Sequence, residues 1–510
     1  MSISLNASYS TRLGLPSLPT ELFWLILDLL KPKDLIRCRR VCREWNSTFS
    51  HPNILVPVFK KHFPWTREVK DLQTASYGID DSSEKVASIR HVFDQVVARY
   101  DYINRGKFRS SQKHQLCSEY NPSGELEWFP VQPFEVHCSQ YHGKVDRLFK
   151  EAMWTYEDGL LVYPDHSVQL FVLLDLERDT ESYVPFFFRG KVVRRVRLQK
   201  RVLVIEWAEP KAFHWLNDSD GVHRHFASSY DVTPSTKEDG TWDITLRNEW
   251  KIMFLGHPLS ERDRFFSSHT KTHYVIYIWQ PNRSLYTADE DAPIESLFVW
   301  DISKKSGYRP SLDPTGSQTG PEVNLAPSIV ARFGYQELEH FDARQRGFPA
   351  IQQLELTDDG QSVYITENVR IFGEDEPQAE GISQTGTIGI PVTGIGPYNR
   401  FVCDYILTVY RSNDNFQQMP LFEYMSFYDT WHSVIAQITD PDSGVIFRLH
   451  FEDNESVRKG DMVYLTIETG EKLITQKAWH LGGTAKISGC DKYLICESPN
   501  GILWINRFDR

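Results

Sequence analysis

Residues that could catalyse a reaction or bind a metal are few in this sequence, and their spacing is poor. Cys38 and Cys42 are four residues apart on a predicted helix, but no second pair of ligands stands at a spacing that would complete a metal site. The His- and Cys-containing segments 137–138 and 223–225 are too short to hold a metal by themselves. We therefore predict no metal site, and we interpret both cysteines as small core residues.

Patterns for phosphate binding and nucleophilic catalysis are also missing. The sequence contains no GxxxxGK phosphate loop, HExxH zinc helix, GxSxG elbow or paired CxxC. Residues 316–320 place their serine wrongly for an elbow, and residues 394–396 lack the third glycine of a dinucleotide fingerprint. Scattered aspartates could pair as glycosidase carboxylates, but turns and strand ends account for them without chemistry. We predict no catalytic residue and no cofactor.

The densest charge cluster is a basic segment, residues 189–201, which holds seven Lys or Arg and no acidic residue. Basic and apolar residues alternate over 195–198, as in a strand that buries one face and exposes the other. One interpretation is a solvated strand whose charges pair with acids of neighbouring strands. The other is a substrate-binding patch of Arg194, Arg195 and Arg197 that docks an acidic or phosphorylated segment, because arginine binds such groups with a planar fork.

Composition limits the partners of the chain. Its 510 residues include 56 Lys or Arg and 68 Asp or Glu, a net charge of −12. The first 65 residues hold nine basic and four acidic side chains, which makes them +5 and the remainder −17. We therefore expect no nucleic-acid partner, and the lack of a stretch of about 18 apolar residues predicts no membrane partner. The odd count of seven cysteines indicates reduced thiols and a cytoplasmic or nuclear protein.

The elements near the N-terminus are predicted to be short amphipathic helices. Apolar residues over 22–29 recur at i, i+3, i+4 and i+7, one face of a helix that Pro32 ends. Asp34 is the expected N-cap of a second helix, whose apolar residues recur as far as Phe49. A further helix is predicted over 84–104. The first two helices cannot bury their apolar faces alone and need a partner.

This stretch resembles an F-box in the order and spacing of Leu18-Pro19-x-Glu21-Leu22, Ile26, Leu29-Leu30, Asp34-Leu35 and Val41-Cys42-x-x-Trp45. The resemblance covers residues 15–62 and implies binding to a Skp-family adaptor and, through it, to a cullin. We expect the adaptor-binding residues to be Leu18, Pro19, Leu22, Ile26, Leu29, Leu35, Val41 and Trp45. The basic residues between them would form a rim that meets an acidic adaptor. The alternative is a helical hairpin that packs on the rest of the chain.

Residues 151–510 are predicted to form β-structure, because short β-branched and aromatic runs recur between turn residues. The runs lie at 160–163, 168–176, 202–207, 274–279, 296–302, 362–366, 433–438, 445–451, 462–467, 493–497 and 502–506. Trp300-Asp301 stands where a WD-type blade closes its third strand, and LLDLE and INRFD resemble degenerate copies. At about 40–50 residues per blade, we predict a β-propeller of six to eight irregular blades with loop insertions at 303–328 and 373–400. Another multi-sheet β architecture is the alternative.

The predicted fold is therefore mainly β with an N-terminal α module. Its parts are a flexible tail (1–14), an F-box helical domain (15–62), a linker with one helix that packs on the next domain (63–150) and a β-propeller-like domain (151–510). The combination resembles fungal F-box proteins with a C-terminal WD-repeat-like region. It implies a non-catalytic SCF-type ubiquitin ligase receptor whose propeller binds an unknown protein substrate. The alternative is a propeller scaffold, or a hydrolase-like propeller enzyme, that carries an F-box-like docking motif.

Overall fold

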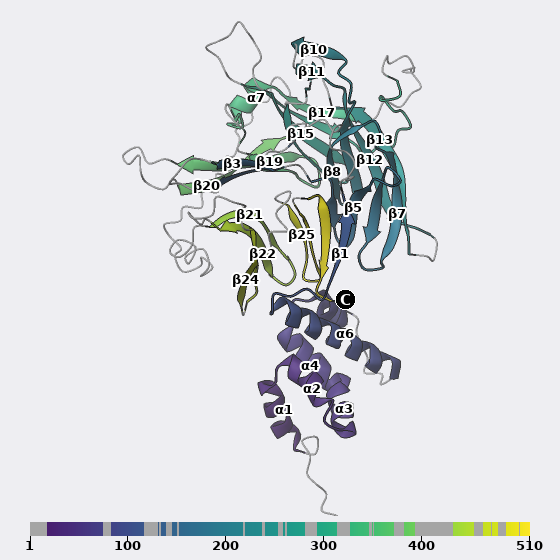
Figure 1. The fold of residues 1–510 in the computed structure, drawn as a ribbon, viewed down its shortest axis with the longest axis vertical. Helices are drawn as coiled ribbons and strands as arrows, with labels where there is room; N and C mark the ends of the chain where they lie inside the picture. Colours follow the sequence, from purple (N-terminus) through teal and green to yellow (C-terminus); the bar gives the residue numbers. More distant parts are fainter. Residues whose placement is uncertain are drawn as a thin grey trace, which may run out of the picture.

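The computed structural model of this protein describes residues 18–74, 83–116, 131, 134–138, 145–149, 152–217, 220–236, 240–252, 259–260, 263–280, 293–313, 327–345, 349, 351–371, 382–392, 432–452, 463–470, 472–477, 486–498 and 500–509. These residues form a helical module at one end of the long axis and a larger, mostly β domain at the other (Figure 1). None of the helices described here is long and apolar enough to cross a membrane.

The helical module consists of short helices followed by one long helix. They are α1 (Thr20–Leu29), α2 (Pro32–Cys38), α3 (Arg43–Ser50), α4 (Pro52–His62), α5 (Arg67–Thr74) and α6 (Ser83–Ile103). Pro32 and Pro52 stand in the first turns of α2 and α4, where the missing N–H costs no helical bond. The single helix expected up to Phe49 is instead α2 and α3, because Cys42 between them is extended. The N-cap of α2 is Lys31, and Asp34 lies inside the first turn, so the predicted cap was wrong.

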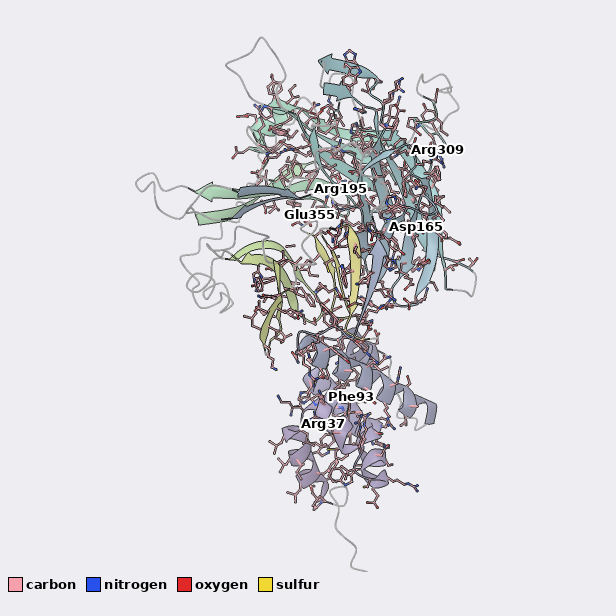
Figure 2. All side chains as sticks on the ribbon, in the orientation of Figure 1. Arg37, Phe93, Asp165, Arg195, Arg309 and Glu355 are labelled. Carbon is pink, nitrogen blue, oxygen red and sulfur yellow. The ribbon has the colours of Figure 1, made fainter. Side chains whose placement is uncertain are left out.

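One apolar core holds these helices together. Phe23 of α1, Phe59 of α4 and Phe93 of α6 are buried in it, with the Phe59 and Phe93 rings 5.6 Å apart edge to face. The long helix α6 packs against α2 and α4, and Figure 2 shows Phe93 inside the module. Helix α6 is the helix predicted over 84–104, whereas α5 was not predicted.

The β domain is built from antiparallel sheets that follow one another along the chain. In the described part, the first of these sheets contains β4 (Thr155–Glu157), β5 (Leu160–Asp165), β6 (Leu170–Asp175) and β7 (Thr180–Phe187), and the second contains β8 (Val192–Gln199), β9 (Val202–Ala208), β12 (His225–Pro234) and β13 (Trp242–Lys251). The third contains β14 (Arg264–His269), β15 (His273–Gln280), β16 (Ile294–Asp301) and β17 (Ser328–Phe333), and the fourth contains β18 (Ile351–Leu356), β19 (Ser362–Ile371) and β20 (Ile382–Pro391). The fifth contains β21 (His432–Thr439), β22 (Ile446–Glu452), β23 (Val463–Glu468) and β24 (Leu473–Lys477).

Among the described residues, the remaining elements are two hairpins, one helix and a sheet made from both ends of the β domain. The hairpins are β2 (Phe134–Cys138) with β3 (Val145–Phe149) and β10 (His214–Asn217) with β11 (Asp220–Val222), and the helix is α7 (Tyr335–His340). The closing sheet has the order β1 (Ser110–Gln115), β27 (Ile502–Arg507), β26 (Tyr493–Glu497) and β25 (Ile487–Gly489).

The closing sheet joins distant parts of the chain. Strand β1 pairs antiparallel with β27, so that Lys113 lies opposite Trp504 and its Nζ sits 4.3 Å from the centre of that ring. Because one strand comes from before the β domain and three from its end, unravelling either end would break this sheet. The sheet therefore ties the start of the β domain to its end.

Neighbouring sheets pack face to face, and in three pairs of sheets the edge strands lie side by side. Strand β4 contacts β8, β14 contacts β18, and β21 contacts β25. Apolar layers fill the space between neighbouring sheets; in one of them, Trp207 of β9 and Phe226 of β12 stack at 4.7 Å and pack against Phe171 of β6. Such radial packing of four-stranded meanders is a propeller-like arrangement. The predicted fold, an N-terminal α module followed by a propeller-like β domain, is thereby confirmed.

The ends of the third strands explain the repeated acidic residues of the sequence. Asp301 ends β16 and its Oδ1 accepts the backbone N–H of Ser303 at 2.9 Å. Asp175 ends β6 and accepts the N–H groups of Glu177 and Arg178 at 2.9 and 3.0 Å. These aspartates build turns, as the sequence indicated. One prediction needs correction, because β20 lies inside the loop insertion expected over 373–400.

Candidate partner-binding surface

Helix α1 has two apolar faces, and one of them packs inside the part of the protein that the structure describes. Phe23 and Leu27 turn inward, and the Phe23 ring lies 5.8 Å from that of Phe49 on α3. On the other face, Leu22, Leu25 and Leu29 are 49%, 62% and 85% exposed. We call these three leucines the α1 outer face. Exposed leucines gathered on one helix face mark a protein-binding surface, since burial against a partner removes them from water.

The structure divides the eight predicted adaptor-binding residues into three groups. Pro19, Leu22, Leu29 and Val41 are exposed, Leu18, Ile26 and Trp45 are half-buried, and Leu35 is 0% exposed. Leu35 belongs to the apolar core of the module, so its assignment as a contact residue was wrong in this arrangement. The Trp45 ring packs 5.5 Å from Phe49. Leu25, which was on the predicted helical face but not among the eight residues, is an exposed member of the α1 outer face.

The basic rim around these helices is smaller than its sequence suggested. Arg39 is buried, donates from Nε to the Phe49 carbonyl oxygen at 2.9 Å and from Nη1 to Asp94 at 2.5 Å. It therefore fastens the α2–α3 connection to α6 instead of facing a partner. Lys31, Arg37, Arg40 and Arg43 are exposed, and Arg37 pairs with Asp34 at 3.0 Å.

A buried ionic cluster fixes the helical module to the β domain. Arg99 of α6 donates to Glu68 of α5 at 2.7 Å and to Asp491 beside β26 at 2.8 Å. Tyr100 donates its hydroxyl to the same Asp491 at 3.1 Å and accepts the Trp65 indole N–H at 3.0 Å. Burial works against the charge of Arg99, but the two carboxylates outweigh burial and raise the pKa of its guanidinium. The junction therefore holds a buried ion cluster.

Side-chain and backbone contacts reinforce this junction where the chain enters the closing sheet. The Phe108 and Phe508 rings are 5.3 Å apart, and the Arg109 N–H donates to the Arg507 carbonyl oxygen at 2.8 Å. Gly106 adopts a φ of 62°, and a Cβ there would lie 2.7 Å from the Ile474 side chain of β24. A larger residue would be strained in φ and would push the helix away from the sheet. The helical module is thus held in one orientation.

Comparison with protein-family models identifies the helical module. Residues 15–55 match the F-box-like family. These residues are an F-box-like domain. Their sequence resemblance to an F-box is thereby confirmed over the part that carries α1, α2 and α3, and such domains in general bind Skp-type adaptors. No curated protein matches the sequence of the chain.

Several solved structures share a distant likeness with the chain. A chain from the mitotic checkpoint complex is 9% identical, with 77% of this chain and 99% of that chain covered, at a TM-score of 0.32. A Trypanosoma rangeli sialidase is 11% identical over 78% of this chain and 59% of its own, at 0.33. The β-propeller domain of the Pyrococcus furiosus trilobed protease is 10% identical over 68% and 90%, at 0.23. The propeller-like arrangement of this chain is defined by its own antiparallel sheets.

The second predicted site, the arginine cluster on β8, is mostly inside the β domain. Arg194 is buried and donates to the Asp263 carbonyl oxygen at 3.2 Å, and Arg195 is buried and donates to Ser267 Oγ at 3.0 Å. Arg197 is half-buried and donates to the same Ser267 carbonyl oxygen that Arg195 contacts. The prediction of an exposed substrate-binding patch is therefore wrong for Arg194 and Arg195. Figure 2 shows Arg195 inside the β domain.

These arginines compensate other buried polar groups between two sheets. Glu206 of β9 accepts the Tyr274 hydroxyl at 2.7 Å; burial raises the pKa of its carboxyl, and the charge of Arg195 opposes that shift. His225 lies 3.2 Å from Arg194, and burial, helped by the arginine charge, holds the pKa of its imidazole well below the ordinary value. The charges hold the sheets together, which the alternation of residues over 195–198 did not reveal.

Metal binding finds no support among the described side chains. No group of three or more His, Cys, Asp or Glu in the described part stands close enough to hold an ion. Cys38 and Cys42 of the F-box-like domain are free, with Cys38 half-buried and Cys42 exposed. The side chains of segment 137–138 lie outside the described residues.

Proposed function

We propose that this protein is a substrate receptor of an SCF-type cullin–RING ubiquitin ligase. The F-box-like domain would bind a Skp-family adaptor, and the propeller-like domain would bind a protein substrate. The observation that carries the proposal is the α1 outer face within residues 15–55, the segment that matches the F-box-like family. A helix that keeps three leucines in water after its other face has packed needs a protein partner.

The energetics of the α1 outer face suit such an interface. Full burial of a leucine side chain contributes about 1.5–3 kcal/mol, so three leucines supply several kcal/mol toward the cost of association. The exposed cations Lys31, Arg40 and Arg43 lie in the same domain and suit an acidic partner. Charge at the rim speeds encounter more than it strengthens the complex.

The proposal gives the chain no catalytic residue of its own. A ligase receptor acts by proximity and orientation, and the Arg99 cluster supports this role because it holds the F-box-like domain at a fixed angle to the β domain. A substrate bound anywhere on the β domain would therefore keep a constant position relative to the adaptor.

The direct test is adaptor co-precipitation with charged substitutions on the α1 outer face. Leu22→Asp combined with Leu25→Asp should abolish recovery of the adaptor and leave the melting temperature unchanged, because both side chains are already exposed. Leu473→Asp on β24 is the matched control, since Leu473 is 48% exposed against 49% for Leu22, and it should recover the adaptor normally. Normal recovery with the double variant would contradict the proposal.

A second measurement separates a receptor from a scaffold. Proteins that co-purify with the full chain under proteasome inhibition should carry ubiquitin, and the Leu22→Asp/Leu25→Asp variant should retain the same proteins without that ubiquitin. Equal ubiquitination with both proteins would exclude the receptor role even if the adaptor binds.

A further inference from the structure

A cavity of about 290 Å³ lies between the outer strands of two neighbouring sheets, far along the chain from the F-box-like domain. Trp250 on β13 and Trp300 on β16 form its walls together with Tyr308 and Pro310, which belong to the segment between β16 and β17. Ile329 of β17 also lines it and is 41% exposed. The volume is at the small end of ligand sites and suits one or two amino-acid side chains.

The walls of this cavity are held in place by the structure around them. The Tyr274 ring lies 5.0 Å from Trp250 and 5.7 Å from Trp300, in the apolar layer between the two sheets. On the opposite side, the Ser306 N–H donates to the Arg247 carbonyl oxygen at 2.9 Å, which lays the 303–313 segment along the edge of β13. Little ordering would therefore accompany binding, and preformed walls favour affinity.

The polar groups that line the cavity indicate the charge of its ligand. Both carboxylate oxygens of Glu249 already accept bonds, one from the Ser311 N–H at 3.0 Å and one from the Ser228 hydroxyl at 3.2 Å. Within the described part of the chain, the ammonium of Lys251 has no hydrogen bond or ion pair, and the buried indole N–H of Trp250 has no acceptor. Two donors without acceptors call for a ligand that brings an acceptor.

A second positive charge stands next to the cavity. Arg309 follows Tyr308, is exposed, and forms no ion pair with any described residue. Figure 2 shows it at the outer side of the β domain, away from the helices. The two cations lie in a part of the chain whose sum of charges is strongly negative, so the mouth of the cavity is a local exception. Charge complementarity therefore favours an acidic ligand over a basic one.

We propose that this cavity binds a short acidic peptide segment of the substrate, with an apolar side chain inserted between Trp250, Trp300 and Pro310 and a neighbouring carboxylate on Lys251. The proposal rests on the receptor function proposed above and names the substrate chemistry that the receptor selects. The carboxylate supplies the acceptor that Lys251 lacks, and the apolar side chain leaves water for an aromatic wall. A serine or glycine at the inserted position would bury no apolar side chain against the aromatic wall.

The test uses the purified full chain and four pools of immobilised hexapeptides. Three pools carry a central Leu or Pro, flanked by acidic residues in the first pool, basic residues in the second and serines in the third. The fourth pool carries a central Ser or Gly between acidic flanks. The acidic–apolar pool should retain at least about fivefold more protein than each of the others, since charge and apolar burial are both required. Equal retention by all pools, or preference for the basic–apolar pool, would overturn the proposal.

Charge reversal at Lys251 provides the sharpest variant. Lys251→Glu should remove the preference for the acidic–apolar pool and shift it toward the basic–apolar pool, because the new carboxylate repels acidic flanks. Lys477→Glu is the matched control, since Lys477 also stands on the outermost strand of a sheet, and it should leave all retentions unchanged. Trp250→Phe, which keeps an aromatic ring without the N–H, should lower retention about twofold. Unchanged retention by both cavity variants would overturn the proposal.

Adaptor binding is measured on the same proteins to separate this site from the receptor function. Lys251→Glu should co-precipitate the adaptor normally, and Leu22→Asp/Leu25→Asp should keep the wild-type preference among peptide pools. Failure of the cavity proposal alone appears as a wild-type chain that binds the adaptor but shows no preference for the acidic–apolar pool. Failure of the receptor proposal alone appears as a wild-type chain that prefers the acidic–apolar pool but does not bind the adaptor.

Discussion

The α1 outer face and the arginine strand β8 look equally amphipathic in sequence, yet the fold uses them in opposite ways. Helix α1 lies at the end of the helical module and packs on one side, so Leu22, Leu25 and Leu29 remain in water. Strand β8 is the first strand of its sheet and has neighbouring sheets on both sides, so its arginines are mostly enclosed. The number of neighbouring layers, and not the residue pattern, decides which face is available to a partner.

Charge reversal on β8 should give the largest effect of this comparison. Arg195→Glu places a second carboxylate beside buried Glu206, and we expect a loss of about 5 kcal/mol in the free energy of unfolding, measured by urea titration. Arg189→Glu is the control from the same basic segment; it is exposed and should change stability by less than about 0.5 kcal/mol. Similar stability for both variants would mean that β8 is as open as α1.

Truncation of Leu35 and of Leu29, two leucines of the F-box resemblance, should show that one is a core residue and the other a surface residue. Leu35→Ala removes a fully buried side chain and should cost about 3.5 kcal/mol of unfolding free energy, because a cavity remains in the core of the module. The comparison variant is Leu29→Ala, whose side chain is 85% exposed and whose loss should leave stability within about 0.5 kcal/mol. If Leu35→Ala has the same free energy of unfolding as the wild type, Leu35 is not a core residue.

Burial of charge inside the β domain should also appear as a pH dependence of stability. Burial raises the pKa of Glu367 on β19 from 4.5 to about 7, with Gln345 opposing and Asp342 and Glu295 adding to the rise. The folded state therefore binds this proton more tightly than the unfolded state, and its stabilising contribution is complete below pH 4.5 and lost as the pH rises through about 7.

Glu367→Gln should remove this dependence. Between pH 4.5 and pH 8, the wild type should lose about 3 kcal/mol of unfolding free energy relative to the variant, since one unit of pKa corresponds to about 1.4 kcal/mol. Parallel stability curves for the two proteins would show that the Glu367 proton is not held by the fold.

The smallest effect is expected at the adaptor interface. Leu29→Ala should weaken adaptor binding by about 1 kcal/mol, roughly fivefold in Kd, because part of one leucine leaves the interface. Isothermal titration of the full chain with the adaptor measures the change. The exposed Leu473→Ala on β24 should bind with wild-type affinity, and equal weakening by both would contradict a specific role for the α1 outer face.

Much of the secondary structure could be predicted because its signals are local. All eleven apolar runs of the β region coincide with strands; the run at 493–497, for example, is β26. Helix α6 and the end of α1 before Pro32 also follow from spacing and from the missing N–H of proline. Trp300-Asp301 at the end of a third strand was likewise visible, because the turn needs its aspartate.

Contacts between distant segments were decided only by the tertiary structure. The sequence by itself determined that two helices near the N-terminus would have apolar faces and that many short strands would follow. It could not determine that Leu35 lies inside and Leu25 outside, that β1 pairs with β27, or that Arg194 and Arg195 are enclosed. Periodicity reports which side chains share a face, whereas burial depends on what packs against that face, and that neighbour comes from elsewhere in the chain.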